Sequence, residues 1–336
     1  MKVLFDHPSP FFLAHGGFET QILQTKAGLE SLGIEVEFAR WWDREQKADL
    51  IHYFSVARPE YLRLAQTQKL PVVMTQLFTE TCNRPTWKLI LQGAAVQTIL
   101  SVPLFRATKD QLNWSAYRAS SHLVVGLEAE KDVLFKVFRV KPSRVSVVPL
   151  GLSKTYLEVS PGDRRGDYLI TTGTITPRKG TVPLAMLARA AQVPVLFVGK
   201  PYHPSDPYWA QFQSLVDDKW VRHHAHVESE LEMISLLGGA RGFVLNSQFE
   251  NWSLSVSEAV ACGLPLLLPH QKWSRERFGS EARYFARPGS RQNVEILRHF
   301  YEDCPQLNAP KIRLFGWPEV AERLKEIYST VLSTSR

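Results

Sequence analysis

The sequence is poor in cysteine and lacks the long apolar run that a membrane-spanning helix needs. Its three cysteines, Cys82, Cys262 and Cys304, lie far apart in 336 residues and form no C-x-x-C pair. This spacing predicts neither a disulfide framework nor a zinc site, and reduced thiols fit a cytosolic compartment. The longest uncharged stretch, residues 89–105, is interrupted by glycine and proline and is short for a bilayer span. We therefore expect a buried or interfacial helix there.

The sequence also lacks a concentrated patch of positive charge. Lys and Arg total 40 and Asp and Glu total 33, a net charge of +7 that is spread evenly along the chain. A nucleic-acid-binding protein more often gathers such an excess in one stripe or tail, so we expect no nucleic-acid partner. The N-terminal segment reaches Asp6 and His7 too early for the apolar core of a signal peptide, which favours a cytoplasmic protein.

Short apolar runs alternate with segments of helical period along most of the chain. Strands are expected at residues 2–5, 36–39, 50–54, 71–75, 122–127 and 145–150, and again at 168–173, 193–199, 221–227, 242–247, 265–268 and 282–285. Continuous apolar runs are typical of parallel strands covered on both faces, and their alternation with helices predicts doubly wound α/β sheets.

A turn-rich, charged segment at residues 160–167 separates the two sets of strands. We therefore predict an N-terminal Rossmann-like domain at residues 1–160 and a second at 167–312, facing a central cleft. Folds of this kind bind ligands at the carboxyl ends of their strands. A helix is expected within residues 313–336.

Two glutamates eight residues apart, Glu250 and Glu258, follow the strand expected at 242–247. If a helix begins near Asn251, Glu250 lies at its mouth and Glu258 about two turns further along. The backbone amides of residues 252–255 would then point out of the helix N-terminus, which suits an anion. The alternative is an ordinary amphipathic helix with two exposed acids.

A glycine turn followed by two cations stands after the first strand of the second half. Gly173 and Thr174 make the turn, and Arg178 and Lys179 follow. Arg binds phosphate in a bidentate manner and Lys acts as a point charge, so the segment is a candidate diphosphate clamp. A solvated basic turn is the alternative.

Other candidates carry less information. Gly16-Gly17 after the first strand would let the backbone approach a ligand, although a helix-entry turn explains it equally. Histidines cluster at His223, His224 and His226, but no carboxylate spacing completes a metal site. Three further histidines, for which a structural role is the alternative to a sugar contact, lie near expected strand ends: His7, His15 and His52.

Taken in order, these motifs resemble the retaining glycosyltransferases of family 4, which have the GT-B fold. The matching elements are Gly16-Gly17, Asp49-x-x-His52, Val147-Val148-Pro149-Leu150-Gly151, Gly173, Lys179-Gly180, and Glu250 with Glu258-Ala259, Ala261-Cys262-Gly263 and Pro265. They extend over almost the whole chain, and the Glu-x7-Glu motif is the most specific of them.

The resemblance implies a role for each motif. Lys179 would hold the donor diphosphate with help from Arg178, Glu258 would accept hydrogen bonds from the donor ribose, and Glu250 would face the transferred sugar. The donor-binding residues that it implies are Gly16, Gly17, Gly173, Thr174, Lys179, Asn251, Trp252, Ser253, Leu254, Glu258 and, near the nucleobase, His226. The C-terminal helix would cross back onto the first domain.

Two positions depart from the family pattern. Thr174 stands where many members have arginine, and Gln76 lies in a loop where members commonly carry a histidine. Glutamine cannot act as a general acid or base. These departures motivate an alternative, a catalytically weak relative that binds nucleotide sugar or a partner enzyme without turnover. A dinucleotide-dependent oxidoreductase is a further alternative, disfavoured because no G-x-G-x-x-G follows an early strand.

The predicted function is transfer of a sugar, with retention, from a nucleoside-diphosphate sugar to an acceptor hydroxyl on a glycan, glycolipid or small molecule. The resemblance implies no metal and no other cofactor. The acceptor-side loops combine Arg84, Trp87, Lys88 and Arg106 with apolar residues. That mixture is compatible with peripheral contact with the inner face of a membrane, and ordinary packing is the alternative.

Overall fold

The structure is a computed structural model that describes residues 1–12, 16–76, 80–102, 111–160 and 166–335. Its contacts divide the chain into two compact units. Unit 1 contains Met1–Ala14, Phe18–Gly151 and Trp317–Arg336, and unit 2 contains His15–Gly17 and Leu152–Gly316. His15 and most of the expected linker, residues 161–165, lie outside the described residues, and the domain limits at 160 and 312 stay a prediction.

Unit 1 is built on a parallel sheet with the strand order β2-β1-β3-β4-β5-β6. The strands are β1 (Lys2–Asp6), β2 (Glu35–Phe38), β3 (Leu50–Phe54), β4 (Val72–Thr75), β5 (His122–Val125) and β6 (Val145–Val147). Every residue of β3, β4 and β5 is buried, which explains why these strands do not alternate between apolar and polar residues. All six strands expected in this part of the sequence are confirmed, some with ends a few residues shorter.

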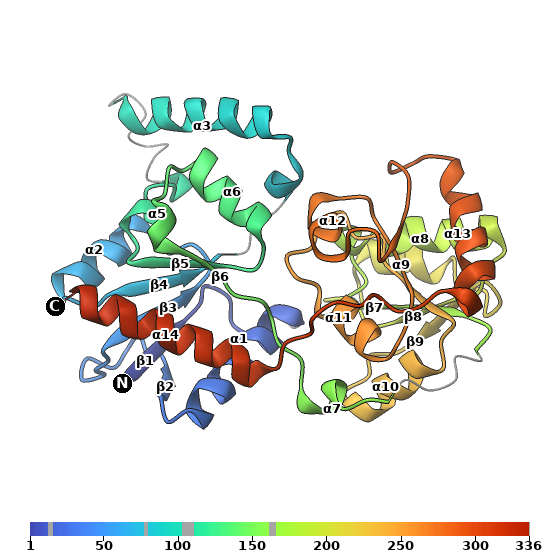
Figure 1. Ribbon diagram of the computed structural model, residues 1–336, viewed down its shortest axis with the longest axis horizontal. Helices are drawn as coiled ribbons and strands as arrows, with labels where there is room; N and C mark the ends of the chain where they lie inside the picture. The colour runs from blue at the N-terminus through green and yellow to red at the C-terminus, as the bar shows by residue number, and fades with distance from the viewer. Residues whose placement is uncertain (13–15, 77–79, 103–110, 161–165, 336) are drawn as a thin grey trace. The chain divides into compact units, whose positions relative to one another are not determined.

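The longest helix of unit 1 comes from the far end of the sequence. The helices are α1 (Gly17–Ser31), α2 (Pro59–Thr67), α3 (Thr86–Ser101), α5 (Ala116–Ala119), α6 (Glu128–Lys136) and α14 (Trp317–Ser335), with short 3-10 turns η1 (Glu80–Asn83) and η3 (Pro142–Arg144). Helix α14 lies across the sheet (Figure 1) and packs so closely on α1 that an added Cβ on Gly28 would lie 3.0 Å from Cβ of Ala321.

A buried histidine joins α14 to the sheet. His52 lies within β3, where its Nδ1 is 2.5 Å from the hydroxyl of Tyr328 and its Nε2 is 2.6 Å from Oγ1 of Thr75. Burial lowers the pKa of His52 to about 3, so the ring is neutral at physiological pH. Its role in this unit is structural.

Helix α3 packs on the side of α6 that faces away from the sheet (Figure 1). The approach is close at Gly93, where an added Cβ would lie 2.2 Å from the carbonyl oxygen of Lys136. The outer side of α3 leaves Trp87, Ile90 and Leu91 more than half exposed. Among the described residues, no helix has the length and apolar character that crossing a membrane requires.

Unit 2 repeats the architecture with the strand order β12-β11-β10-β7-β8-β9, again all parallel. Its strands are β7 (Leu169–Thr172), β8 (Val195–Val198), β9 (Val221–His224), β10 (Gly242–Val244), β11 (Leu266–Leu268) and β12 (Arg283–Tyr284). All six confirm the expected strands. The helices are α7 (Lys154–Leu157), α8 (Thr181–Ala191), α9 (Pro207–Gln213), α10 (Glu230–Gly238), α11 (Leu254–Ala261), α12 (Lys272–Phe278) and α13 (Gln292–Asp303), with turns η4 (Pro177–Lys179) and η5 (Cys304–Gln306).

The core of unit 2 lies between its sheet and helices α8, α9 and α13. Phe197 of β8, Phe212 of α9 and Leu297 of α13 are fully buried in one apolar cluster. The three cysteines of the chain, Cys82, Cys262 and Cys304, are buried.

The strand orders fix where each sheet can bind a ligand. In unit 1 the connections leave β1 toward β2 on one side and reach β3 on the other, so the topological switch point lies between β1 and β3. In unit 2 it lies between β7 and β10. Doubly wound sheets bind ligands at the carboxyl ends of the strands at this point, which directs attention to the segments after β7 and β10.

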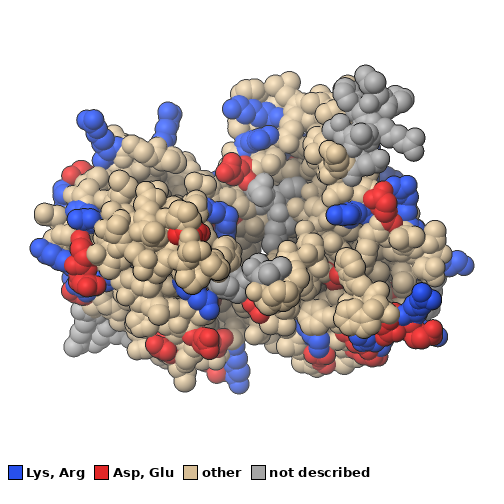
Figure 2. Space-filling model, turned by 180° about the vertical axis from the view of Figure 1, so that it is seen from behind, with Lys and Arg blue, Asp and Glu red and all other residues tan. Residues whose placement is uncertain are grey.

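Charged side chains of both signs are spread over the surface as they are along the sequence (Figure 2). On the face shown in Figure 2, Lys and Arg side chains are scattered among Asp and Glu rather than gathered over one element. This face offers no continuous basic stripe of the kind that tracks a phosphate backbone.

Candidate active site

The turn after β7 requires glycine at two places. Gly173 has φ +142°, and its amide donates to the carbonyl oxygen of Val198 at 3.0 Å. Gly199, at the end of β8, has φ +154°, and an added Cβ there would lie 2.0 Å from the carbonyl oxygen of Gly173. Backbone thus packs directly against backbone, which leaves the end of β7 open to a ligand.

The predicted clamp is held against the segment that follows β10. Gly180 ends η4 with φ +64°, and an added Cβ would lie 2.3 Å from the carbonyl oxygen of Asn246. The amide of Gln248 donates to the carbonyl oxygen of Arg178 at 2.8 Å. The two sequence motifs therefore meet at the switch point, although some seventy residues separate them.

Glu250 lies at the centre of the cluster that results. Nζ of Lys179 donates to Oε1 of Glu250 at 2.6 Å, and Oγ of Ser247 donates to the same atom at 2.7 Å. Nη1 of Arg178 lies 3.6 Å from that oxygen and donates to the carbonyl oxygen of Phe249 at 3.1 Å. Burial alone would raise the pKa of Glu250, but the two cations and the hydrogen bonds outweigh it and hold this pKa below its usual value.

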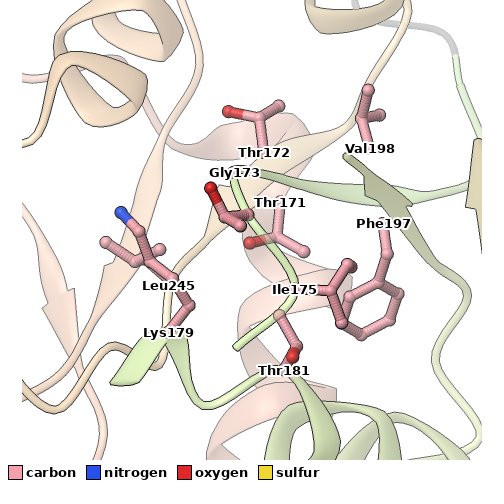
Figure 3. A pocket seen from close by; sticks show the side chains of 10 residues that line it. Thr171, Thr172, Gly173, Ile175, Lys179, Thr181, Phe197, Val198 and Leu245 are labelled. Atoms are coloured by element: carbon pink, nitrogen blue, oxygen red, sulfur yellow. The ribbon is translucent and has the colours of Figure 1, made fainter. Parts of the chain in front are cut away.

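A pocket opens beside this cluster (Figure 3). Its lining residues come from β7, the turn after it, α8, β8 and the end of β10: Thr171, Thr172, Gly173, Thr174, Ile175, Lys179, Thr181, Phe197, Val198 and Leu245. Oγ1 of Thr172 is buried here and has no hydrogen-bond partner among the described residues. A polar atom of this kind in a pocket is available to a ligand.

The second glutamate lies deeper along the same segment. Helix α11 begins at Leu254, so Glu250 lies in the preceding loop and not at the mouth of a helix that starts near Asn251. Burial and the nearby carboxylate of Glu230 raise the pKa of Glu258 to about 7, with Lys179 opposing the shift. Glu258 is therefore close to half-protonated at neutral pH.

Comparison with known proteins identifies the fold on which this site lies. Sucrose-phosphate synthase from Thermosynechococcus elongatus superimposes with a TM-score of 0.72 at 14% identity, covering 99% of this chain and 100% of that one. Anabaena HepE in complex with UDP-glucose superimposes with a TM-score of 0.70 at 16% identity, covering 98% and 100%. The chain has the GT-B fold. The fold implied by the sequence resemblance is thereby confirmed.

Sequence similarity is more limited than the GT-B likeness. O-antigen chain mannosyltransferase B of Escherichia coli is 23% identical over 153 residues. The match covers 41% of this chain and 40% of the mannosyltransferase, so the chain spans less than half the length of that relative. No model of a protein family matches the chain.

Arg277 of α12 contacts the loop after Glu250, and the sequence did not reveal this contact. Its guanidinium carbon lies 3.8 Å from the ring centroid of Trp252. Its Nη1 donates to the carbonyl oxygen of Trp252, and Nη2 donates to Oγ of Ser257 at 3.1 Å. Ser253, next to Trp252, has φ +58°, an uncommon conformation for a residue other than glycine. Arg277 thus holds residues 252–253 outside the helix, which explains the late start of α11.

Replacing Arg277 with methionine is expected to weaken donor binding about tenfold. The loop after Glu250 then loses the guanidinium that packs on Trp252, together with the hydrogen bonds that this group donates. The donor affinity of Arg277→Lys should lie between those of the wild type and Arg277→Met, because lysine keeps the positive charge but lacks the planar guanidinium that donates two bonds at once. The control is Arg275→Met, an exposed arginine on the same helix. Loss of thermal stability with unchanged donor affinity in the folded variant would contradict a positioning role.

The remaining predicted donor residues lie in several places. Asn251, Trp252 and Ser253 form the loop that Arg277 holds, and His226 is exposed after β9. Gly16, with φ +127°, and Gly17 group with unit 2 by their contacts. Their roles stay predictions.

The two histidines that precede His226 lie at hydrogen-bond distance from backbone carbonyl oxygens. Nε2 of His223 lies 2.9 Å from the carbonyl oxygen of Gly199, and Nδ1 of His224 lies 2.9 Å from that of Ala225. Across the described parts of the chain, no three His, Cys, Asp or Glu side chains gather as a metal site would need.

Proposed function

We propose that this protein is a retaining glycosyltransferase that moves a sugar from a nucleoside-diphosphate sugar to an acceptor hydroxyl. The observation that carries the proposal is the Lys179–Glu250 pair beside the open glycine turn at the switch point of unit 2. A cation and a carboxylate side by side match the two ends of such a donor, its charged diphosphate and its hydroxyl-bearing sugar. The solved HepE complex with UDP-glucose, on the same fold, supports this choice of donor class.

Lys179 supplies the charge that the reaction needs at the leaving group. Its ammonium has three donors, so it can keep the bond to Glu250 and still reach a phosphate oxygen. Arg178, with a side chain about half exposed, adds a second cation. Donors fixed where negative charge develops stabilise the departing diphosphate, and these residues can do so without a metal ion.

Glu250 and Glu258 act as acceptors in the proposal. The lowered pKa of Glu250 keeps it ionised, so it accepts hydrogen bonds from sugar hydroxyls. Glu258, with its pKa near 7, accepts from the ribose hydroxyls once it is deprotonated. In the transfer, the bond from the sugar to the diphosphate breaks and the bond to the acceptor oxygen forms on the same face of the sugar. The departing diphosphate takes the proton of the acceptor hydroxyl, so no nucleophile from the protein is needed.

Calorimetry on the full chain, without metal, tests the proposal with UDP-glucose, GDP-mannose, ADP-glucose and TDP-glucose. We expect saturable binding to donors of one base, followed by transfer to an acceptor panel. A folded chain that binds none of the four would reject the proposal.

A binding protein without turnover is the second candidate. Gln76 favours it, because this residue is buried at the end of β4 and its side chain offers no titrating group. Its backbone amide donates to the carbonyl oxygen of Val124 at 2.9 Å. Donor binding without transfer to any acceptor would select this candidate.

We also propose peripheral contact between unit 1 and an anionic membrane surface. The exposed Trp87, Ile90 and Leu91 of α3 provide apolar area, and Arg84 and Lys88 provide charge. Residues 84–102 contain no acid. Such a combination binds lipid headgroups and acyl chains together, which flotation with phosphatidylglycerol vesicles tests.

A further inference from the structure

The carboxyl edge of the unit 1 sheet gathers unusually exposed aromatic side chains. Phe12 is 86% exposed, Trp42 83% and Trp41 77%, the largest exposed fractions of any large apolar side chain in the described part of the chain. Phe12 follows β1 and the tryptophans follow β2, its parallel neighbour. Parallel strands end at one edge, so the three residues belong to the same edge of the sheet. Exposed apolar side chains that group together are typical of a binding surface, whereas single ones are common.

A buried carboxylate orients one of these rings. Oδ1 of Asp6, a residue only 5% exposed, accepts from Nε1 of Trp41 at 3.3 Å and from the amide of His7 at 2.8 Å. Oδ2 accepts from the hydroxyl of Tyr61 at 2.8 Å. Burial and the Asp6 charge raise the pKa of Tyr61 far above its usual value, so the phenol keeps its proton and donates. The hydrogen bond from Nε1 thus fixes the position of the Trp41 indole, while most of its ring is exposed to solvent.

This anchor lies at the switch point of unit 1, between β1 and β3. Ser55, just after β3, has φ +130°, a conformation that a serine rarely adopts. Nδ1 of His7 is buried and has no hydrogen-bond partner among the described residues. A strained backbone conformation and a buried polar atom without a hydrogen-bond partner are both typical of ligand sites.

The side chains around Trp41 and Trp42 suit a sugar ring. A hexose ring has an apolar C–H face that packs on an indole and a rim of hydroxyls that need polar neighbours. Arg40 and Asp43, joined at 2.8 Å, flank the tryptophan pair in the sequence and provide such neighbours. The exposed face of α3, by contrast, combines a single tryptophan, Trp87, with Ile90, Leu91 and Lys88, a mixture that suits lipid.

We propose that Trp41 and Trp42 form a platform that binds a hexose ring of a glycan acceptor. The proposal rests on the proposed function as a glycosyltransferase and adds to it the class of acceptor and the residues that hold it. A ring oriented in advance by Asp6 binds with less loss of conformational freedom than a free side chain would.

Indole ¹⁵N NMR of the full chain tests the platform without donor or turnover. Maltose, cellobiose and mannobiose are the probes, and Trp42→Ala and Trp41→Phe assign the two resonances. We expect saturable shifts of both indoles with at least one disaccharide, and binding about tenfold weaker in Trp42→Ala. Trp41→Phe keeps a ring but loses the bond to Asp6, so it should weaken binding less.

The matched control is Trp87→Ala, which removes an exposed tryptophan from α3 and should leave disaccharide binding unchanged. The platform is rejected if no disaccharide moves the two indoles, or if Trp87→Ala weakens binding as much as Trp42→Ala. Shifts caused by phosphatidylglycerol vesicles instead of sugars would also reject it.

A transfer assay separates this proposal from the proposed function. Trp42→Ala should raise the acceptor KM about tenfold and leave the donor KM unchanged. An unchanged acceptor KM in an active enzyme overturns the platform alone, whereas a chain that binds disaccharide but no donor overturns the proposed function alone.

Discussion

Replacing Lys179 with methionine is expected to weaken donor binding at least about 100-fold. The variant keeps the length of the side chain but removes the cation proposed to meet the diphosphate, and charge-assisted bonds of this kind are among the stronger ones in proteins. Calorimetry with the donor that the wild-type chain binds measures the loss.

Two further variants make this result specific. Lys200→Met removes an exposed lysine from the end of β8 and should leave donor affinity unchanged. Lys179→Met also removes the closest cation from Glu250 and leaves Arg178 and Ser247 as its partners, at a cost in stability of up to about 3 kcal/mol. Adding Glu250→Gln should recover stability but not donor affinity. Recovery of both would mean that Lys179 serves only to neutralise Glu250.

Acid is expected to destabilise unit 1 through His52. An unfolded chain protonates this histidine near pH 6.5, whereas burial lowers its pKa to about 3 in the folded state. Because the unfolded state binds the extra proton, stability is full above pH 6.5 and falls as pH drops toward 3. The slope is about 1.4 kcal/mol per pH unit, or roughly 3–5 °C in the apparent unfolding midpoint.

His52→Gln isolates this contribution, because glutamine can hydrogen-bond to Tyr328 or Thr75 without titrating. The variant should be less stable than wild type at pH 7, yet its midpoint should depend less steeply on pH between 6 and 4. His122, whose pKa is lowered to about 4 by burial and by Arg144, retains its own share of the slope. Equal slopes in the two proteins would show that His52 is not the group that titrates.

The twelve strands and the Lys179–Glu250 motifs could be predicted because each depends on neighbours in the sequence. A buried parallel strand must be an apolar run, and the glycine after β7 stands next to its strand in the sequence. The start of α11 could not be predicted, because Arg277, more than twenty residues away, holds Trp252 outside the helix. Nothing in the sequence pairs those two residues.

The same limit applies to the histidine of the Asp49-x-x-His52 motif and to the tryptophan platform. The position of His52 near an expected strand end suggested a possible ligand contact, and only its bond to Tyr328 in α14 reveals a structural residue. In the sequence, Trp41 and Trp42 resemble part of an ordinary loop, and only the structure shows that Trp41 donates a hydrogen bond to the buried Asp6. Contacts of this kind depend on tertiary structure and leave no periodic signal.

The position of α14 in the sequence has a consequence for biosynthesis. The ribosome makes Leu152–Gly316, nearly all of unit 2, before it makes α14 of unit 1. Until then the sheet of unit 1 lacks Tyr328, the partner of His52, and the face that α14 covers is open to water or to a chaperone. Unit 2 can fold before α14 is made, whereas unit 1 is complete only after α14 has been made.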